Sequence, residues 1–207
     1  MKYSNIYNLV LPNKKIILFV FSLIMFGLIS GSCFLVISNA TDKTNVINQI
    51  NLFFTNISNN KINNVQALKN SLIINYIFVL SIWILGFSII GIIINLFLTY
   101  LKGFIVGFSI SSIFLTFKYK GILAAIIYTI PSQLLNIIIV SVLSIYSITF
   151  TKHLLTLIFS KKTINSRKTL KKYIIIFVLS IIITFISSLL EVYLFPNLLK
   201  LIISIYV

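Results

Sequence analysis

The fold is decided by the stretch NSLIINYIFVLSIWILGFSIIGIIINLFLTYL, residues 70–101, in which no side chain carries a charge. It is 32 residues long, whereas a helix needs only about 20 apolar residues to cross the hydrocarbon core of a bilayer. Backbone polar groups find no water in lipid, so a spanning segment must satisfy its own hydrogen bonds as a helix. The many Ile, Val and Phe residues, which favour strands in water, are therefore expected to be helical here. The stretch predicts an integral membrane protein.

The rest of the chain has a similar composition. Its 207 residues are 59% hydrophobic and 9% charged, and its mean hydropathy is +1.10, whereas a soluble domain is about 45–50% apolar. The 17 Lys and Arg residues and two acids give a formal charge of +15. The basic residues form short clusters between apolar runs, which is typical of membrane proteins and not of nucleic-acid binders.

The chain has few side chains that could catalyse a reaction or bind a metal. The chain has one His, one Cys and two acids, too few for the active sites of most enzyme classes or for a metal cluster. A single Cys also precludes an internal disulfide, so helix packing must hold the fold together. We expect a protein that is not an enzyme and that has no catalytic, cofactor-binding or metal-binding residues.

Five apolar runs bounded by charged residues predict an all-α polytopic membrane bundle, formed as one domain by residues 1–207. The expected spans are approximately 16–37, 71–95, 103–118, 121–150 and 173–194. The third run has only 15 residues between Lys102 and Lys118, about 22 Å of helix, so it is either a short span or a re-entrant turn. Both lysines can extend into the headgroups, and we therefore assign it as a span.

The basic residues predict the orientation, because Lys and Arg near span ends are retained in the cytoplasm. With the N-terminus inside, the cytoplasmic segments hold 11 Lys and Arg residues, Lys102 included, and the outer segments hold six. The densest cluster lies in the loop at residues 152–172, which is basic enough to contact anionic lipid. The expected topology is a cytoplasmic N-terminus, an outer loop at residues 38–70 and a C-terminus outside.

The outer loop is rich in Asn and carries apolar residues at helical spacing. These are Val46, Ile47, Ile50, Phe53, Phe54 and Ile57. They predict an amphipathic helix, which either lies on the outer leaflet and caps the bundle or presents an edge to a partner protein. In the second case, Phe53 and Phe54 are the candidate partner-binding residues, because an exposed aromatic pair is a plausible interface anchor.

Two GxxxG patterns are candidate sites of close helix packing, since glycine lets a neighbouring backbone approach. They are Gly27 with Gly31, and Gly103 with Gly107. A bundle of five spans offers many partner helices, so packing within one chain is favoured over dimerisation.

Two polar features interrupt the apolar runs. Glu191 ends the last run, where an acid is costly unless it is protonated, paired or solvated. We expect a structural role, with Lys69, Lys118, Lys120 or a helix end as partner, and proton or ion translocation is the functional alternative. In the fourth run, Pro131 stands beside Ser132, Gln133 and Asn136. This notch either supports a kink or lines a small cavity.

Four segments together resemble the stage II sporulation protein M family. They are WILGFSIIG from Trp83, LKGFIVGFSISSIF from Leu101, KGILAAIIYTIPSQLLNI from Lys120 and LEVYLFP from Leu190. The resemblance covers nearly the whole chain and is weakest at residues 38–70. It implies a membrane protein of endospore-forming bacteria, located in the mother-cell membrane at the sporulation septum. Such a protein is a non-enzymatic scaffold that anchors two peptidoglycan-degrading partners, stage II sporulation proteins P and D, during engulfment.

The competing hypothesis is a permease-like membrane subunit of a transporter that depends on a separate ATPase. The membrane interior has few polar groups, and the basic loop is the only candidate for docking an ATPase. Both features argue against this alternative.

Overall fold

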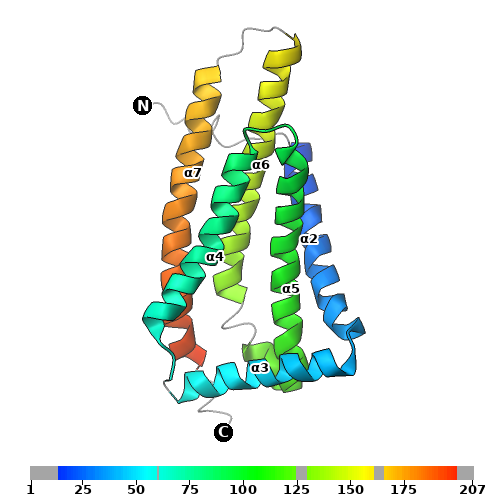
Figure 1. Cartoon of the computed structure of the whole chain (residues 1–207), viewed down its shortest axis with the longest axis vertical. Helices are drawn as coiled ribbons and strands as arrows, with labels where there is room; N and C mark the ends of the chain where they lie inside the picture. Colours follow the sequence, from blue (N-terminus) through cyan, green and yellow to red (C-terminus); the bar gives the residue numbers. More distant parts are fainter. Residues whose placement is uncertain (1–13, 60, 125–129, 161–165, 200–207) are drawn as a thin grey trace.

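A computed structural model describes residues 14–59, 61–124, 130–160 and 166–199. Within these ranges every regular element is helical. The elements are α2 (Lys14–Ile37), α3 (Ala40–Ser58), α4 (Asn64–Leu85), α5 (Gly91–Ala124), α6 (Ile130–Ser160), α7 (Ser166–Leu189) and the π-helical turn η2 (Leu190–Leu194). Five long helices run side by side, and α3 lies across one end of them (Figure 1). The predicted all-α bundle of membrane-spanning helices is confirmed.

Five of the described helical segments are long and apolar enough to cross a membrane. They are Lys14–Ile37, Asn64–Leu85, Gly91–Lys118, Gln133–Phe159 and Arg167–Leu199. Their exposed faces are apolar, as in Phe21, Phe97 and Ile182, and suit contact with lipid chains. The long helices fit a multi-pass membrane protein.

The bounds of the second, third and fourth spans differ from those predicted. The fourth was expected at 121–150, but α5 continues to Ala124 and α6 covers Ile130–Ser160. For the second and third, the sequence indicated 71–95 and 103–118, but α4 ends at Leu85 and α5 starts at Gly91. The prediction used Lys102 as a boundary because it is charged, whereas Lys102 lies inside α5 and is only 4% exposed. The third span therefore has 28 residues, enough for a full crossing, and a re-entrant turn is not needed.

The basic loop predicted at residues 152–172 is also mostly helical. Helix α6 continues to Ser160 and α7 begins at Ser166. Both helices extend past the other three at the end of the bundle opposite α3 (Figure 1). Lys152, Arg167, Lys168 and Lys171 are exposed on these extensions. We call this the basic end of the bundle.

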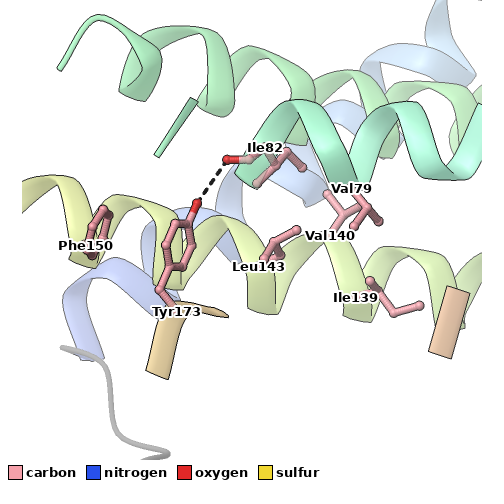
Figure 2. Close-up of a cluster of buried hydrophobic side chains, with 7 residues drawn as sticks. All are labelled: Val79, Ile82, Ile139, Val140, Leu143, Phe150 and Tyr173. Carbon is pink, nitrogen blue, oxygen red and sulfur yellow. Dashed lines mark hydrogen bonds between the residues drawn. The ribbon is translucent and has the colours of Figure 1, made fainter. Parts of the chain in front are cut away.

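The main apolar core joins α4, α6 and α7. It consists of Val79, Ile82, Ile139, Val140, Leu143, Phe150 and Tyr173 (Figure 2). The Tyr173 ring stacks on Phe150 with centroids 4.8 Å apart. Its hydroxyl donates to the carbonyl oxygens of Ile82, at 3.3 Å, and Trp83, at 2.7 Å. Both carbonyls lie in the last turn of α4, and they also accept from Ser147, at 3.1 Å, and from the backbone N–H of Gly86, at 3.2 Å, respectively.

The two GxxxG patterns face each other in the contact between α2 and α5. A Cβ on Gly31 would collide with the carbonyl oxygen of Phe104, and one on Gly107 would collide with that of Leu28. Gly27 and Gly103 also lie directly against the backbone of the opposite helix. The four glycines therefore pack within one chain and allow α2 to lie directly on the backbone of α5.

Hydrogen bonds accompany this close approach. The hydroxyls of Ser30 and Tyr100 are 2.8 Å apart, and Ser32 donates to the carbonyl oxygen of Gly107 at 3.1 Å. Such bonds between helices replace contacts with water that lipid cannot provide.

Helix α3 packs its apolar face onto the end of the bundle. Phe54 and Ile57 are buried against Ile113 and Leu199, and the rings of Phe54 and Phe117 have centroids 4.6 Å apart. The opposite face of α3 is polar and exposed. The amphipathic pattern thus produces a helix that crosses the bundle end with one face against the protein.

Candidate functional site

The interior of the bundle contains many polar side chains, contributed by α4, α5, α6 and α7. The buried ones include Asn75, Asn95, Thr99, Lys102, Asn136, Ser144, Ser147, Thr151, Ser180, Thr184, Ser187 and Ser188. Polar groups are costly within a membrane, and those that persist face the bundle interior and often mark a functional site. The candidate site therefore lies between these four helices.

Lys102 is the charged residue buried deepest in this interior. It follows Gly91 by 11 residues and precedes Lys118 by 16, so it lies near the middle of its span. Its Nζ donates to Oδ1 of Asn75 at 3.1 Å and lies 5.3 Å from the ring centroid of Phe78. A neutral amide and the face of an aromatic ring thus stabilise the ammonium.

A chain of hydrogen bonds connects Lys102 to Glu191. The amide Nδ2 of Asn75 donates to Oγ of Ser71 at 3.3 Å, and Ser71 donates to Oε2 of Glu191 at 2.7 Å. At the far side, Nε2 of Gln133 lies 3.5 Å from Oε1 of Glu191. Glu191 also attracts the Lys102 ammonium electrostatically. The two opposite charges are therefore joined through Asn75 and Ser71.

We call this set of residues the Lys102–Glu191 network. Its members are Ser71, Asn75, Lys102, Gln133, Ser188 and Glu191. Ser188 belongs to it because its Oγ is 3.1 Å from that of Ser71. The network connects α4, α5, α6 and α7 with η2, so it links every helix around the interior.

Glu191 lies in the π-helical turn η2. A π-helical turn inserts a residue into a helix and occurs frequently at functional sites. Nothing in the apolar pattern of residues 173–194 indicates this turn.

The partners of Glu191 differ from those expected. The sequence indicated Lys69, Lys118 or Lys120, whereas the carboxylate accepts from Ser71 and Gln133 and faces the charge of Lys102. Lys102 was not among the expected partners because the sequence placed it at the cytoplasmic membrane surface, opposite Glu191. The side chain of Lys120 lies outside the described residues.

Two cavities border Glu191 near the α3 end. The larger, of about 440 Å³, lies between α3 and α5 and reaches Gln133 and Glu191. The smaller, of about 110 Å³, is bounded by Phe53, Ser71, Pro196 and Glu191 among others. We call the larger one the α3 cavity. It gives the network access to the α3 end of the molecule.

The polar notch around Pro131 was expected either to support a kink or to line a small cavity, and Gln133 does line the α3 cavity. Helix α6 begins at Ile130, so Pro131 lies in the first turn, where the missing N–H breaks no helical hydrogen bond. Gln133 joins the Lys102–Glu191 network, and Asn136 is buried nearby along α6 with no hydrogen-bond partner for its Nδ2. The side chain of Ser132 lies outside the described residues. Pro131 thus starts the helix that carries Gln133.

Phe53 and Phe54 are not an exposed pair. Phe54 is only 7% exposed because it packs against α5, and half-buried Phe53 lines both cavities. Helical periodicity predicted that both residues share the apolar face, but the sequence did not show that the bundle covers this face. The large apolar side chain exposed on α3 is Leu52, at 57%.

Sequence reasoning missed Ser71, Asn75 and Lys102 as site residues. The available signal was a lysine flanked on both sides by long apolar runs, which is also the signature of an intramembrane charge. The described residues contain no group of three His, Cys, Asp or Glu side chains that could hold a metal ion. The candidate site is therefore a charged, hydrogen-bonded interior next to a cavity.

Of the comparisons with known proteins, the one with family models gives a match. A family model described as stage II sporulation protein M matches residues 16–196. No curated protein and no solved structure matches the chain. The family match extends from the first turn of α2 past Glu191 and η2, and so includes α3 and all but the outermost residues of the bundle. The chain belongs to the stage II sporulation protein M family.

Proposed function

We propose that this membrane protein is a non-enzymatic scaffold that positions peptidoglycan-degrading partners during engulfment in endospore formation. Membership of the family makes it a sporulation-related membrane protein, and the family is not known as one of enzymes. By family resemblance, the partners are stage II sporulation proteins P and D. The site of action is the mother-cell membrane at the sporulation septum.

The observation that carries the proposal is the orientation of α3. Helix α3 lies across the bundle end (Figure 1). Its apolar face is covered by the bundle, and its other face is an exposed, mostly polar surface. We call this surface the α3 platform. Its exposed residues are Thr44, Asn48, Asn51, Leu52, Thr55 and Asn59. A partner can bind this surface without disturbing the packing of α3.

The distribution of charge supports an outer position for the platform. Lys14, Lys15, Lys168 and Lys171 are exposed at the basic end, opposite α3. Lys102 is buried inside α5 and no longer counts as a cytoplasmic residue. The remaining cytoplasmic Lys and Arg residues still outnumber the six in the outer segments. By the positive-inside rule the basic end is cytoplasmic, and the α3 platform faces the compartment that contains peptidoglycan.

A scaffold of this kind acts through effective concentration. Binding to a membrane anchor confines a hydrolase to a thin layer next to its substrate and raises its local concentration without any chemistry in the anchor. The few reactive side chains of this protein suit such a role.

The test is recovery of the hydrolases with tagged protein from sporulating cells. Leu52→Arg combined with Thr55→Arg places two charges on the platform, and we expect at least tenfold lower recovery of both partners with unchanged protein abundance. Lys168→Gln combined with Lys171→Gln is the control at the opposite end and should leave recovery unaltered. Normal septal localisation of the hydrolases in cells lacking this protein would exclude the scaffold role.

One observation favours the alternative, a permease-like subunit of a transporter. Ionisable residues inside a membrane commonly lie on substrate or proton pathways, and the Lys102–Glu191 network connects such residues. Co-purification of an ATPase with the tagged protein, together with normal engulfment in the Leu52→Arg, Thr55→Arg variant, would support the transporter in place of the scaffold.

A further inference from the structure

The α3 cavity has the size of a binding site. Its volume of about 440 Å³ lies in the lower part of the range of about 300–1,000 Å³ for small-molecule sites. Asn45 and Gln49 of α3 line it and are exposed, so the edge of α3 forms its rim. The cavity therefore opens beside the α3 platform.

Gln133 and Glu191 line this cavity, and each carries a hydrogen-bond acceptor without a strong partner among the described residues. Gln133 turns its Nε2 toward Glu191, and its Oε1 is buried with no hydrogen-bond partner. Among the described residues, the partner of Glu191 Oε1 is Gln133, at a long 3.5 Å, whereas the short bond from Ser71 goes to Oε2. Buried acceptors are normally satisfied, so these two oxygens favour a group that donates hydrogen bonds.

The charges around the cavity favour a cation. Glu191 is the charged residue among the described lining residues, and none of them is basic. Lys102 donates to Asn75, and both Asn75 and Ser71 lie between its ammonium and the carboxylate. A cation in the cavity would contact the carboxylate directly, whereas Lys102 would act on it only from farther away.

The remaining walls are aromatic and aliphatic. Phe53, Phe54 and Phe108 line the cavity together with Val46 and Ile113. Aromatic faces attract cations, and apolar walls accommodate the hydrocarbon stem that carries a Lys or Arg head group. The volume suits one long side chain and is too small for a second helix.

We propose that the α3 cavity receives a Lys or Arg side chain of an extracytoplasmic partner protein, with Glu191 and the Oε1 of Gln133 as its acceptors. This inference rests on the proposed scaffold function, and it assigns the partner a basic anchor residue next to the surface that contacts the platform. A basic side chain in a desolvated pocket surrounded by weaker contacts is a common arrangement at interface hot spots.

The first experiment compares the two acids at the α3 end. Glu191→Gln removes the charge from the cavity and keeps an amide that can hydrogen-bond with Ser71. Asp42→Asn removes the same charge from an exposed position on α3. We expect Glu191→Gln to lower recovery of the hydrolase partners at least tenfold, and Asp42→Asn to leave it within twofold of the unmodified protein. Equal recovery with both variants would overturn the inference.

The second experiment probes the cavity itself and needs no partner. Ser109 lines the cavity, so Ser109→Cys in a Cys33→Ser background reports access when modified by a small neutral methanethiosulfonate. With the full chain in detergent micelles, n-octylammonium should slow this modification at least fivefold, whereas n-octanol should have little effect. Adding Glu191→Gln should abolish the difference. Equal protection by the two probes would show that the cavity does not select a cation.

The two experiments separate this inference from the scaffold proposal. If hydrolases are not recovered even with the unmodified protein, the scaffold proposal fails. The assignment of a partner's side chain to the cavity then fails as well. Protection by octylammonium would still show that the cavity binds a cation. If hydrolases bind and Glu191→Gln has no effect in either assay, only the cavity inference fails. A primary-amine lipid that co-purifies with the unmodified protein and is lost in Glu191→Gln would assign the cavity to lipid and overturn a protein side chain as its occupant.

Discussion

Lys102 is the residue on which the interior of the bundle depends. A charged side chain at the centre of a membrane helix costs about 2.5–3.5 kcal/mol on insertion scales. Here three groups offset that cost, namely the amide of Asn75, the ring of Phe78 and the negative charge of Glu191. The amide orients the ammonium, the ring faces it and the carboxylate balances its charge. Lys102 and Glu191 should therefore behave as one energetic unit.

A double-mutant cycle tests this coupling. Lys102→Met leaves the Glu191 charge without its counter-charge, and we expect a loss of stability on the order of 2 kcal/mol. Adding Glu191→Gln should restore at least about 1 kcal/mol, since the double variant contains neither charge. Thermal unfolding of purified protein in detergent measures both values. Strictly additive effects would mean that the two charges are independent.

The role of Glu191 in packing makes a separate prediction. Glu191→Gln keeps hydrogen-bonding capacity toward Ser71 and Gln133, whereas Glu191→Ala removes both contacts. Leaving these buried groups unsatisfied costs about 1–3 kcal/mol. We expect Glu191→Ala to reduce the amount of protein in the membrane and Glu191→Gln to retain most of it, as measured by immunoblot of membrane fractions. Normal abundance of the alanine variant would argue that Glu191 does not contribute to packing.

At the scale of elements, the contact between α2 and α5 shows how spacing in the sequence becomes structure. The GxxxG patterns place two glycines on one face of each helix, and this face is smooth enough for backbone contact. The sequence could not show which helices meet, because each pattern fits any neighbour. In the structure the two patterns fit each other, so both sets of glycines form a single interface.

Substitution in this interface should separate the helices. Gly31→Leu and Gly107→Leu each place a side chain where the opposite carbonyl lies, and we expect a loss of about 3 kcal/mol or more, since the backbones must move apart. Cys33→Leu is the matched control, because Cys33 is exposed on the same helix. It should change stability by no more than about 0.5 kcal/mol. Equal thermal midpoints for Gly31→Leu and Cys33→Leu would contradict the interface.

At the scale of the whole molecule, the sequence predicted those features that depend on composition and on local patterns of apolar residues. Long apolar runs indicated five spans, and the periodicity of Ile50, Phe54 and Ile57 indicated the amphipathic α3. Sequence reasoning singled out Glu191 and Gln133 but missed the Lys102–Glu191 network that contains them, because its members lie far apart in the chain. Using charges as span boundaries also concealed Lys102, since a lysine with partners inside the bundle looks the same in sequence as one at the surface.

The orientation of the whole molecule follows from the separation of its two ends. The basic end carries exposed Lys168 and Lys171, and the α3 end carries Asn59 at the edge of the platform. If the positive-inside rule sets the topology, a cysteine at Asn59 in a Cys33→Ser background should react with an impermeant thiol reagent in intact protoplasts. A cysteine at Lys168 should react only after the membrane is permeabilised, because it faces the cytoplasm. The reverse pattern would place the platform inside the cell, where it could not hold enzymes that act on the cell wall.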